Sequence, residues 1–133
     1  MLAAVAEMEK ILVSIIDDDE PVRKATARLL MSAGFRAETF ASAEEFFNSG
    51  LGRSPSCLIV DMQMPGISGL QLYARLVASG TPVPTIIITA YPDERVRARA
   101  LRAGIISYLG KPFSADELIE CIRSVTRNGK GEN

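Results

Sequence analysis

The chain alternates short, uninterrupted apolar runs with segments of helical periodicity, and this alternation restricts its fold more than any other feature. Apolar runs rich in Ile and Val are typical of strands buried on both faces of a parallel sheet. The helical segments between them end at glycines such as Gly34, Gly80 and Gly104. The sequence therefore predicts five strands, at residues 11–16, 36–40, 57–60, 85–89 and 105–109.

Five strands that alternate with helices require parallel pairing through right-handed crossovers. We therefore expect a single α/β domain in three layers, with a doubly wound parallel sheet of five strands between two helix layers. The flavodoxin-like strand order 2-1-3-4-5 is favoured. The order found in dinucleotide-binding domains is disfavoured, because no G-x-G-x-x-G pattern follows the first strand.

The expected domain spans residues 10–127, with a leader at residues 1–9 and a polar tail at residues 128–133. The leader carries Glu7 and Glu9 and lacks a basic start, so it is a poor match to a signal peptide. No apolar run in the sequence is long enough to span a membrane. We therefore expect a cytoplasmic protein that makes no membrane contact.

Charge and cysteine content narrow the possible functions. The sequence has 15 Lys and Arg against 16 Asp and Glu, so its formal net charge of −1 gives no bulk attraction to nucleic acid. Direct nucleic-acid binding by this chain is therefore disfavoured. Cys57 and Cys121 lie in apolar stretches without metal-type or redox-type spacing, which favours reduced core thiols over a disulfide.

Polar side chains follow the ends of the predicted strands, where the functional crevice of such sheets lies. Asp17 and Asp18 follow the first strand, and Asp61 follows the third. Thr89 ends the fourth strand, and the fifth leads into Lys111. Three carboxylates, a hydroxyl and a lysine are thus expected on one rim of the sheet.

This combination of side chains indicates phosphoryl chemistry. Clustered carboxylates repel each other unless a cation neutralises them, and an all-oxygen cluster favours Mg²⁺. A carboxylate can act as a nucleophile and form an aspartyl phosphate. The metal and a lysine then offset the charge of the transferring group. Taken singly, these residues have simpler interpretations, since Asp17 and Asp18 can favour a helix N-terminus and Asp61 can be a turn residue.

The sequence resembles the receiver domain of bacterial response regulators over about residues 10–127. Four motifs carry the resemblance and occur in order: Ile15-Ile16-Asp17-Asp18-Asp19-Glu20, Val60-Asp61-Met62-Gln63-Met64-Pro65-Gly66, Ile87-Ile88-Thr89-Ala90 and Lys111-Pro112-Phe113. The segments around Pro21 and Ser42 are similar to receivers of LuxR-type transcription factors. No helix-turn-helix segment follows, which leaves open a stand-alone receiver or a DNA-binding domain outside this sequence.

The resemblance implies a role for each matched residue. Asp61 matches the phosphate acceptor and Asp18 the main Mg²⁺ ligand, with Asp17 in support. Gln63 lies where the family provides a main-chain carbonyl to the metal. Thr89 matches the switch hydroxyl, and Tyr108 matches the switch aromatic residue. Lys111 matches the lysine that pairs with the phosphoryl oxygens, and in the family its bond to the following proline is cis.

Some positions depart from the usual family pattern. Ile105 follows Gly104 where the family often has alanine, and Gly110 precedes Lys111 where a larger residue is common. Gln63 and Tyr91 lie at positions that tune dephosphorylation in the family, so the phosphate lifetime is left open.

The resemblance implies a switch that catalyses only its own phosphorylation and dephosphorylation. Its donor is expected to be a histidine kinase or a phosphotransfer protein, because this chain contains no histidine. A phosphorylation-dependent homodimer is a further possible partner arrangement, and the expected output is transcription. A phosphatase of the haloacid-dehalogenase type is disfavoured, because Gln63 replaces the acid needed two residues after Asp61. A degenerate, purely partner-binding receiver is disfavoured because the key acids and Lys111 are present.

Overall fold

The computed structural model describes residues 11–50 and 55–131, so the expected leader lies outside the described residues. Its strands are parallel and are ordered β2-β1-β3-β4-β5, which confirms the flavodoxin-like order. The strands are β1 (Leu12–Ile16), β2 (Arg36–Phe40), β3 (Cys57–Asp61), β4 (Thr85–Thr89) and β5 (Ser107–Gly110). The helices are α2 (Glu20–Ser32), α3 (Ala43–Asn48), α4 (Gly69–Ala78), α5 (Glu94–Ala103) and α6 (Ala115–Gly131).

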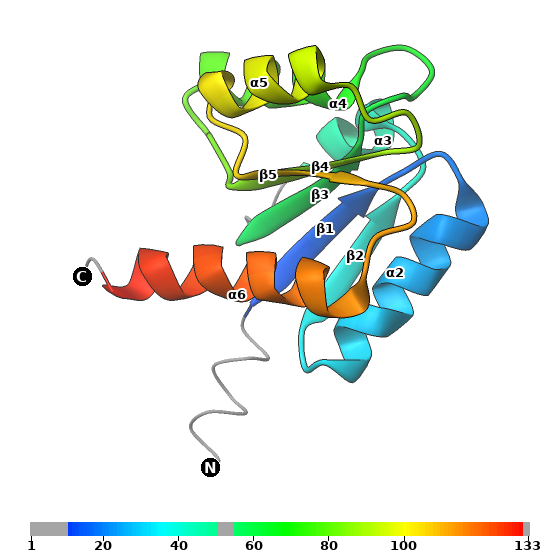
Figure 1. The fold of residues 1–133 in the computed structure, drawn as a ribbon, viewed down its shortest axis with the longest axis vertical. Helices are drawn as coiled ribbons and strands as arrows, with labels where there is room; N and C mark the ends of the chain where they lie inside the picture. Colours follow the sequence, from blue (N-terminus) through cyan, green and yellow to red (C-terminus); the bar gives the residue numbers. More distant parts are fainter. Residues whose placement is uncertain (1–10, 51–54, 132–133) are drawn as a thin grey trace.

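The helices form two layers, with α2 and α6 on one face of the sheet and α3, α4 and α5 on the other (Figure 1). Alternate residues of the central strands supply the two cores, as the pleat of a strand requires. On β3, Ile59 packs in the core that includes Leu118 of α6, whereas Val60 packs in the core that includes Leu72 of α4. The continuous apolar runs are therefore explained by burial on both faces.

The strand register brings the carboxyl ends of neighbouring strands to the same level. Ile16 pairs with Val60, so the residues that follow them, Asp17 and Asp61, leave the sheet side by side. Thr89 pairs with Gly110, so Lys111, the next residue, lies directly beyond the end of β4. The rim predicted from the sequence thus arises from the register of the backbone.

Side-chain caps fix where the helices begin. The Asp19 carboxylate accepts from the Val22 N–H at the start of α2, and the hydroxyls of Ser42 and Ser114 accept from Glu45 N and Glu117 N. These bonds satisfy backbone donors that have no partner within the helix. None of the helices in the described part of the chain has both the length and the apolar character needed to cross a bilayer.

The last helix and the fifth strand have boundaries that differ from the prediction by two residues or more. The last helix continues to Gly131, beyond the predicted end at Arg127, because polar residues without proline do not stop a helix. The strand predicted from Ile105 begins at Ser107, because the Ile105 N–H donates to the Ala100 carbonyl and so completes the end of α5.

Gly69 lies where α4 meets the end of β3. A Cβ atom at this position would be 2.7 Å from the main-chain oxygen of Asp61 and 3.1 Å from Val60 Cγ1. The nearer atom belongs to the backbone of the strand that presents Asp61, and this backbone cannot move away as a flexible side chain can. The absence of a side chain at residue 69 therefore lets α4 pack directly on this strand.

We predict that Gly69→Ala lowers the free energy of unfolding by about 1–3 kcal/mol, because the helix must move away from β3. The measurement is urea unfolding followed by circular dichroism. Gly110→Ala is the matched control, since its Cβ would meet only side-chain atoms of Pro92, at 3.2 Å. An equal or smaller loss for Gly69→Ala than for Gly110→Ala would contradict the close-packing argument.

Candidate functional site

Three carboxylates meet at the rim formed by the ends of β1 and β3. Ligand atoms of Asp17, Asp18 and Asp61 all lie within 4.8 Å of one another. Asp17 is fully buried and Asp61 is 5% exposed, whereas Asp18 is exposed to solvent. The cluster therefore combines two enclosed carboxylates with one that is open to approaching ions.

Lys111 joins this cluster from the loop after β5. Its Nζ atom lies 3.1 Å from Oδ2 of Asp17 and 3.4 Å from Oδ2 of Asp61. One ammonium group thus contacts both buried carboxylates. The Lys111–Pro112 peptide bond is cis, as the resemblance implied.

Burial and the neighbouring charges shift the pKa values of Asp61 and Lys111. Burial raises the pKa of Asp61 to about 7, and the charge of Asp17 adds to this rise against the opposing charge of Lys111. Burial alone would lower the pKa of Lys111, but the neighbouring carboxylates of Asp17 and Asp61 outweigh it and raise that pKa. Lys111 is therefore charged at neutral pH and does not fully compensate the carboxylates.

The donor set fits a hard divalent cation. Magnesium prefers oxygen ligands and binds through one or two carboxylates while keeping several waters. Oδ2 of Asp17 is buried and, apart from its ion pair with Lys111, has no hydrogen-bond partner among the described residues. Excess negative charge and a buried carboxylate oxygen paired only with Lys111 are both features that a cation at Asp17, Asp18 and Asp61 would satisfy.

Local hydrogen bonds hold the β1–α2 loop in place. Oδ1 of Asp17 accepts from the Asp19 N–H at 2.9 Å. The Arg23 guanidinium donates to the main-chain oxygen of Asp17 at 2.7 Å. Sequence reasoning missed this role of Arg23, because no pattern in the sequence marks a side chain that bonds a main-chain oxygen six positions earlier.

The hydroxyl of Thr89 lies within a small hydrogen-bond network at the end of β4. Thr89 Oγ1 donates to Oε1 of Gln63 at 2.9 Å and accepts from the Tyr91 N–H at 3.0 Å. The Tyr108 hydroxyl accepts from the Asp93 N–H at 3.3 Å, while its half-buried ring packs beside Ile87. Both the hydroxyl and the aromatic residue are thus bonded to the segment between β4 and α5.

Most of the residues singled out in the sequence are brought together. Asp17, Asp18, Asp61 and Lys111 form one contact group. Gln63 is linked to this group because its N–H donates to Oδ1 of Asp61 at 3.2 Å. Thr89 joins through the Gln63 side chain, a contact that the sequence did not predict, whereas Tyr108 bonds the β4–α5 loop instead of the acids.

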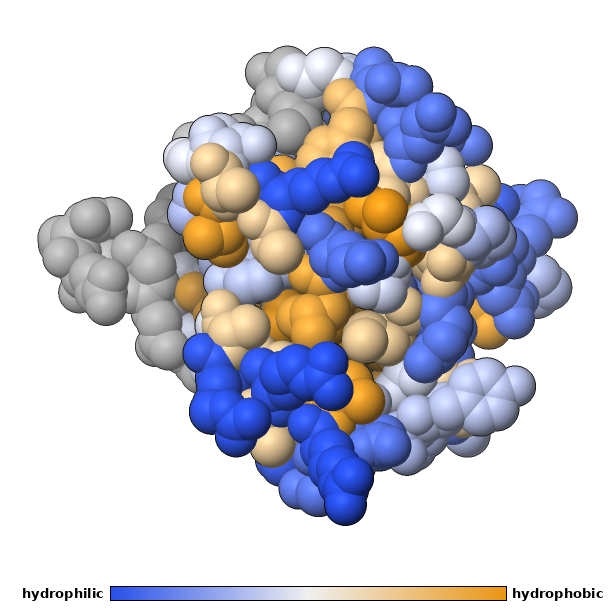
Figure 2. Space-filling model, turned by 90° about the horizontal axis from the view of Figure 1, so that it is seen from above, coloured by the Kyte–Doolittle hydropathy of each residue, from blue (hydrophilic) through white to orange (hydrophobic). Residues whose placement is uncertain are grey.

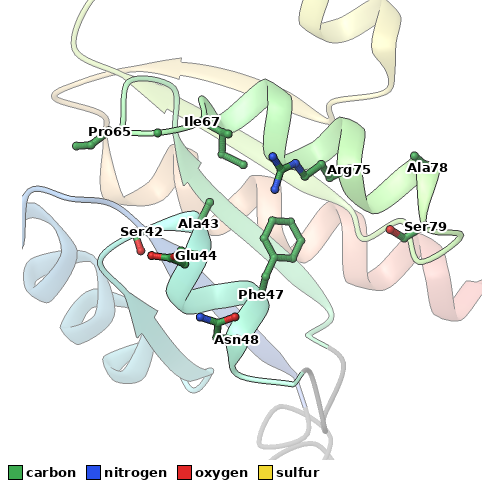
Figure 3. Close-up of a pocket in the computed structure, with 11 residues that line it drawn as sticks. Ser42, Ala43, Glu44, Phe47, Asn48, Pro65, Ile67, Arg75, Ala78 and Ser79 are labelled. Atoms are coloured by element: carbon green, nitrogen blue, oxygen red, sulfur yellow. The ribbon is translucent and has the colours of Figure 1, made fainter.

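A groove of about 810 Å³ lies elsewhere, between α3 and α4 (Figure 3). Phe47 and Arg75 face each other across it, with the guanidinium carbon 6.0 Å from the ring centroid. Asp17, Asp61 and Lys111 do not line this groove. It is therefore a feature of the helix layer, separate from the acidic rim.

Comparisons with known proteins match this chain to one family. A family model described as the response regulator receiver domain matches residues 13–123. The transcriptional regulatory protein FixJ of Bradyrhizobium diazoefficiens is 35% identical over 116 residues, which cover 87% of this chain and 57% of FixJ. The response regulator protein TodT of Pseudomonas putida is 34% identical over 116 residues, covering 87% of this chain and 51% of TodT. The chain thus spans about half the length of these curated relatives.

Solved structures give the same result at the level of the fold. The structure of FixJ-N has a TM-score of 0.81 and 33% identity, covering 90% of this chain and 96% of FixJ-N. A response regulator receiver protein from Burkholderia phymatum has a TM-score of 0.77 and 40% identity, covering 87% of this chain and 94% of that protein.

The raised pKa of Asp61 predicts how stability depends on pH without divalent cations. The folded protein holds a proton at Asp61 up to about pH 7, whereas the ordinary value is 3.8, so this stabilising contribution is lost as pH rises between these values. We predict that Asp61→Asn, which does not titrate, is more stable than the wild type by about 1–2 kcal/mol above pH 7.

The measurement is the difference in Tm between the two proteins in a chelator, at about pH 5 and about pH 8. The advantage of Asp61→Asn is expected to grow with pH, and Mg²⁺ is expected to stabilise the wild type selectively. A difference in Tm that does not change with pH would show that Asp61 titrates normally.

Proposed function

This chain belongs to the response regulator receiver family, and we propose that Asp61 is its phosphate acceptor. Receivers of this family are modules of two-component systems, and the relative FixJ is a transcriptional regulatory protein. One observation carries the proposal: Asp61 ends β3 beside two further carboxylates, with Nζ of Lys111 3.4 Å from its Oδ2. This arrangement supports a role for Asp61 as the nucleophile, with a cation held by the neighbouring carboxylates and Lys111 as a fixed positive charge.

The proposed reaction is transfer of a phosphoryl group from a phosphohistidine. An oxygen of the Asp61 carboxylate forms the new P–O bond while the P–N bond to the donor imidazole breaks. The electron pair of the broken bond stays on the imidazole nitrogen. The donor is a partner histidine kinase or phosphotransfer protein, because this chain has no histidine.

The surrounding residues account for reactivity at neutral pH. Asp61 must be ionised to attack, and burial works against this by raising its pKa to about 7. We propose that Asp17, Asp18, Asp61 and the main-chain carbonyl of Gln63 hold Mg²⁺. When bound, Mg²⁺ supplies positive charge that favours the ionised carboxylate and offsets the phosphoryl oxygens. Lys111 contributes a second positive charge to the same oxygens.

The phosphorylated form is proposed to differ in the segment between β4 and α5. A phosphoryl group on Asp61 offers strong acceptor oxygens to the Thr89 hydroxyl and to Lys111. New bonds to these groups favour one of two conformations already available to the protein. Tyr108, which bonds the same segment through Asp93 N, is proposed to change its position with Thr89.

The signal is proposed to leave through the face formed by α5, β5 and α6. Figure 2 views the molecule from the side of α4 and α5, where strongly hydrophilic side chains surround smaller hydrophobic areas. The exposed basic residues of α5 are Arg95, Arg97, Arg99 and Arg102. These can pair with acids of a second copy in a phosphorylation-dependent dimer. The transcriptional output, the absence of direct nucleic-acid binding and the cytoplasmic location also stay predictions.

The proposed chemistry predicts a single covalent phosphate on Asp61. Incubation of the wild type with acetyl phosphate and Mg²⁺ is expected to add one phosphoryl mass, measured on the intact protein and removed by hydroxylamine. Asp61→Asn is expected to show no adduct. Asp116→Asn, which replaces an exposed acid on α6, is the matched control and is expected to behave as the wild type.

Two outcomes would contradict the proposed function. A folded wild type that gains no phosphate and releases no inorganic phosphate would not be a phosphate acceptor. An adduct that persists in Asp61→Asn would move the acceptor to another residue.

A further inference from the structure

Gln63 contacts both the proposed phosphate acceptor and the Thr89 hydroxyl. Its N–H donates to Oδ1 of Asp61 at 3.2 Å, and its side-chain Oε1 accepts from Thr89 Oγ1 at 2.9 Å. The side-chain bond links residues 26 positions apart, from the ends of neighbouring strands. Gln63 is otherwise exposed to solvent, so this contact is not a by-product of core packing.

The bond to Gln63 occupies the whole donor capacity of Thr89. A threonine hydroxyl has a single proton to donate. Oγ1 already accepts from the Tyr91 N–H at 3.0 Å, so its proton points to the other partner, Oε1 of Gln63. Thr89 is fully buried, which limits replacement of either partner by water. A new acceptor can therefore bond this hydroxyl only if Gln63 releases it.

We propose that the side-chain amide of Gln63 is a latch that competes with the phosphoryl group on Asp61 for the Thr89 proton. The latch stabilises the unphosphorylated conformation, so the hydrogen bond between Gln63 and Thr89 must be broken, at a cost in free energy, when the protein is phosphorylated. This inference rests on the proposed function of Asp61. It assigns the side chain of Gln63 a positioning role, distinct from that of its main-chain carbonyl.

The position of Gln63 couples the latch to events at Asp61. Its N–H and side chain belong to one residue, so a change at Oδ1 of Asp61 moves the backbone that carries the amide. Movement of Thr89 Oγ1 toward a phosphoryl group on Asp61 would also take the acceptor away from the Tyr91 N–H, at the start of the segment that Tyr108 bonds through Asp93 N. The Lys111 N–H donates to the Thr89 carbonyl at 2.7 Å, so the backbone of Thr89 is tied to the site independently of the latch.

The test measures the affinity for beryllofluoride, a phosphoryl analogue, in the presence of Mg²⁺. Binding is followed by two-dimensional NMR of the full chain for the wild type, Gln63→Met, Thr89→Val and the double variant. Methionine keeps the length of glutamine but has no amide oxygen, and valine keeps the shape of threonine without its hydroxyl. Gln63→Met is expected to bind about threefold to tenfold more tightly than the wild type, as expected for loss of one competing hydrogen bond.

The Thr89→Val background separates the latch from other effects of Gln63. In Thr89→Val no hydroxyl proton is present for Gln63 and the phosphoryl analogue to compete for. By the logic of a double-mutant cycle, Gln63→Met is therefore expected to change the affinity for beryllofluoride less than twofold in this background. Gln71→Met is the matched control, because the Gln71 side chain accepts from the Ser68 N–H at the start of α4 and makes no hydrogen bond to Asp61 or Thr89 within the described residues. It is expected to bind as the wild type does.

Two results would overturn the latch. One is unchanged or weaker binding by Gln63→Met, and the other is an equal gain in both Thr89 backgrounds. In either case, binding by the wild type would leave the proposed function of Asp61 standing. Failure of the folded wild type to bind beryllofluoride with Mg²⁺ would instead overturn the proposed function, and the latch with it.

Discussion

The buried charge imbalance at the rim of the sheet is the constraint on which the rest of the site depends. Asp17 and Asp61 are both enclosed, and one ammonium group, that of Lys111, contacts both. Burial of like charges is costly unless a cation or a proton compensates it. The site therefore favours either a proton on Asp61 or a divalent cation. The protonation of a carboxylate held in this balance is sensitive to any charge that is added beside it.

The fold creates this imbalance through backbone geometry. The parallel register of β1 and β3 places Asp17 and Asp61 side by side, and Gly69 lets α4 pack against the main chain of Asp61. The bonds from Asp19 N to Asp17 and from Gln63 N to Asp61 then hold each carboxylate in place. These contacts are local to the rim, whereas the two apolar cores hold the strands that carry it. Stability of the cores thus maintains an arrangement that is electrostatically unfavourable by itself.

The sequence predicted the features that follow from burial and from strand ends. Strands buried on both faces leave continuous apolar runs, so the strand order and the acidic rim could be inferred. Contacts across the sequence leave no such pattern, which is why the bond between Gln63 and Thr89 was not predicted. Small residues are also ambiguous, since Ala25 of α2 is exposed, whereas Ala27 of the same helix is buried. Alanine fits either environment, so it specifies the rotation of a helix weakly.

The most direct test of the charge imbalance is the titration of the Asp61 carboxyl group, followed by its ¹³C NMR signal with and without Mg²⁺. Without the cation, the signal is expected to titrate with a pKa of about 7. With Mg²⁺, the same carboxyl is expected to stay ionised through neutral pH, because the cation replaces the proton. A pKa near the ordinary value of 3.8 without Mg²⁺ would contradict the account, since Lys111 alone would then compensate the buried carboxylates.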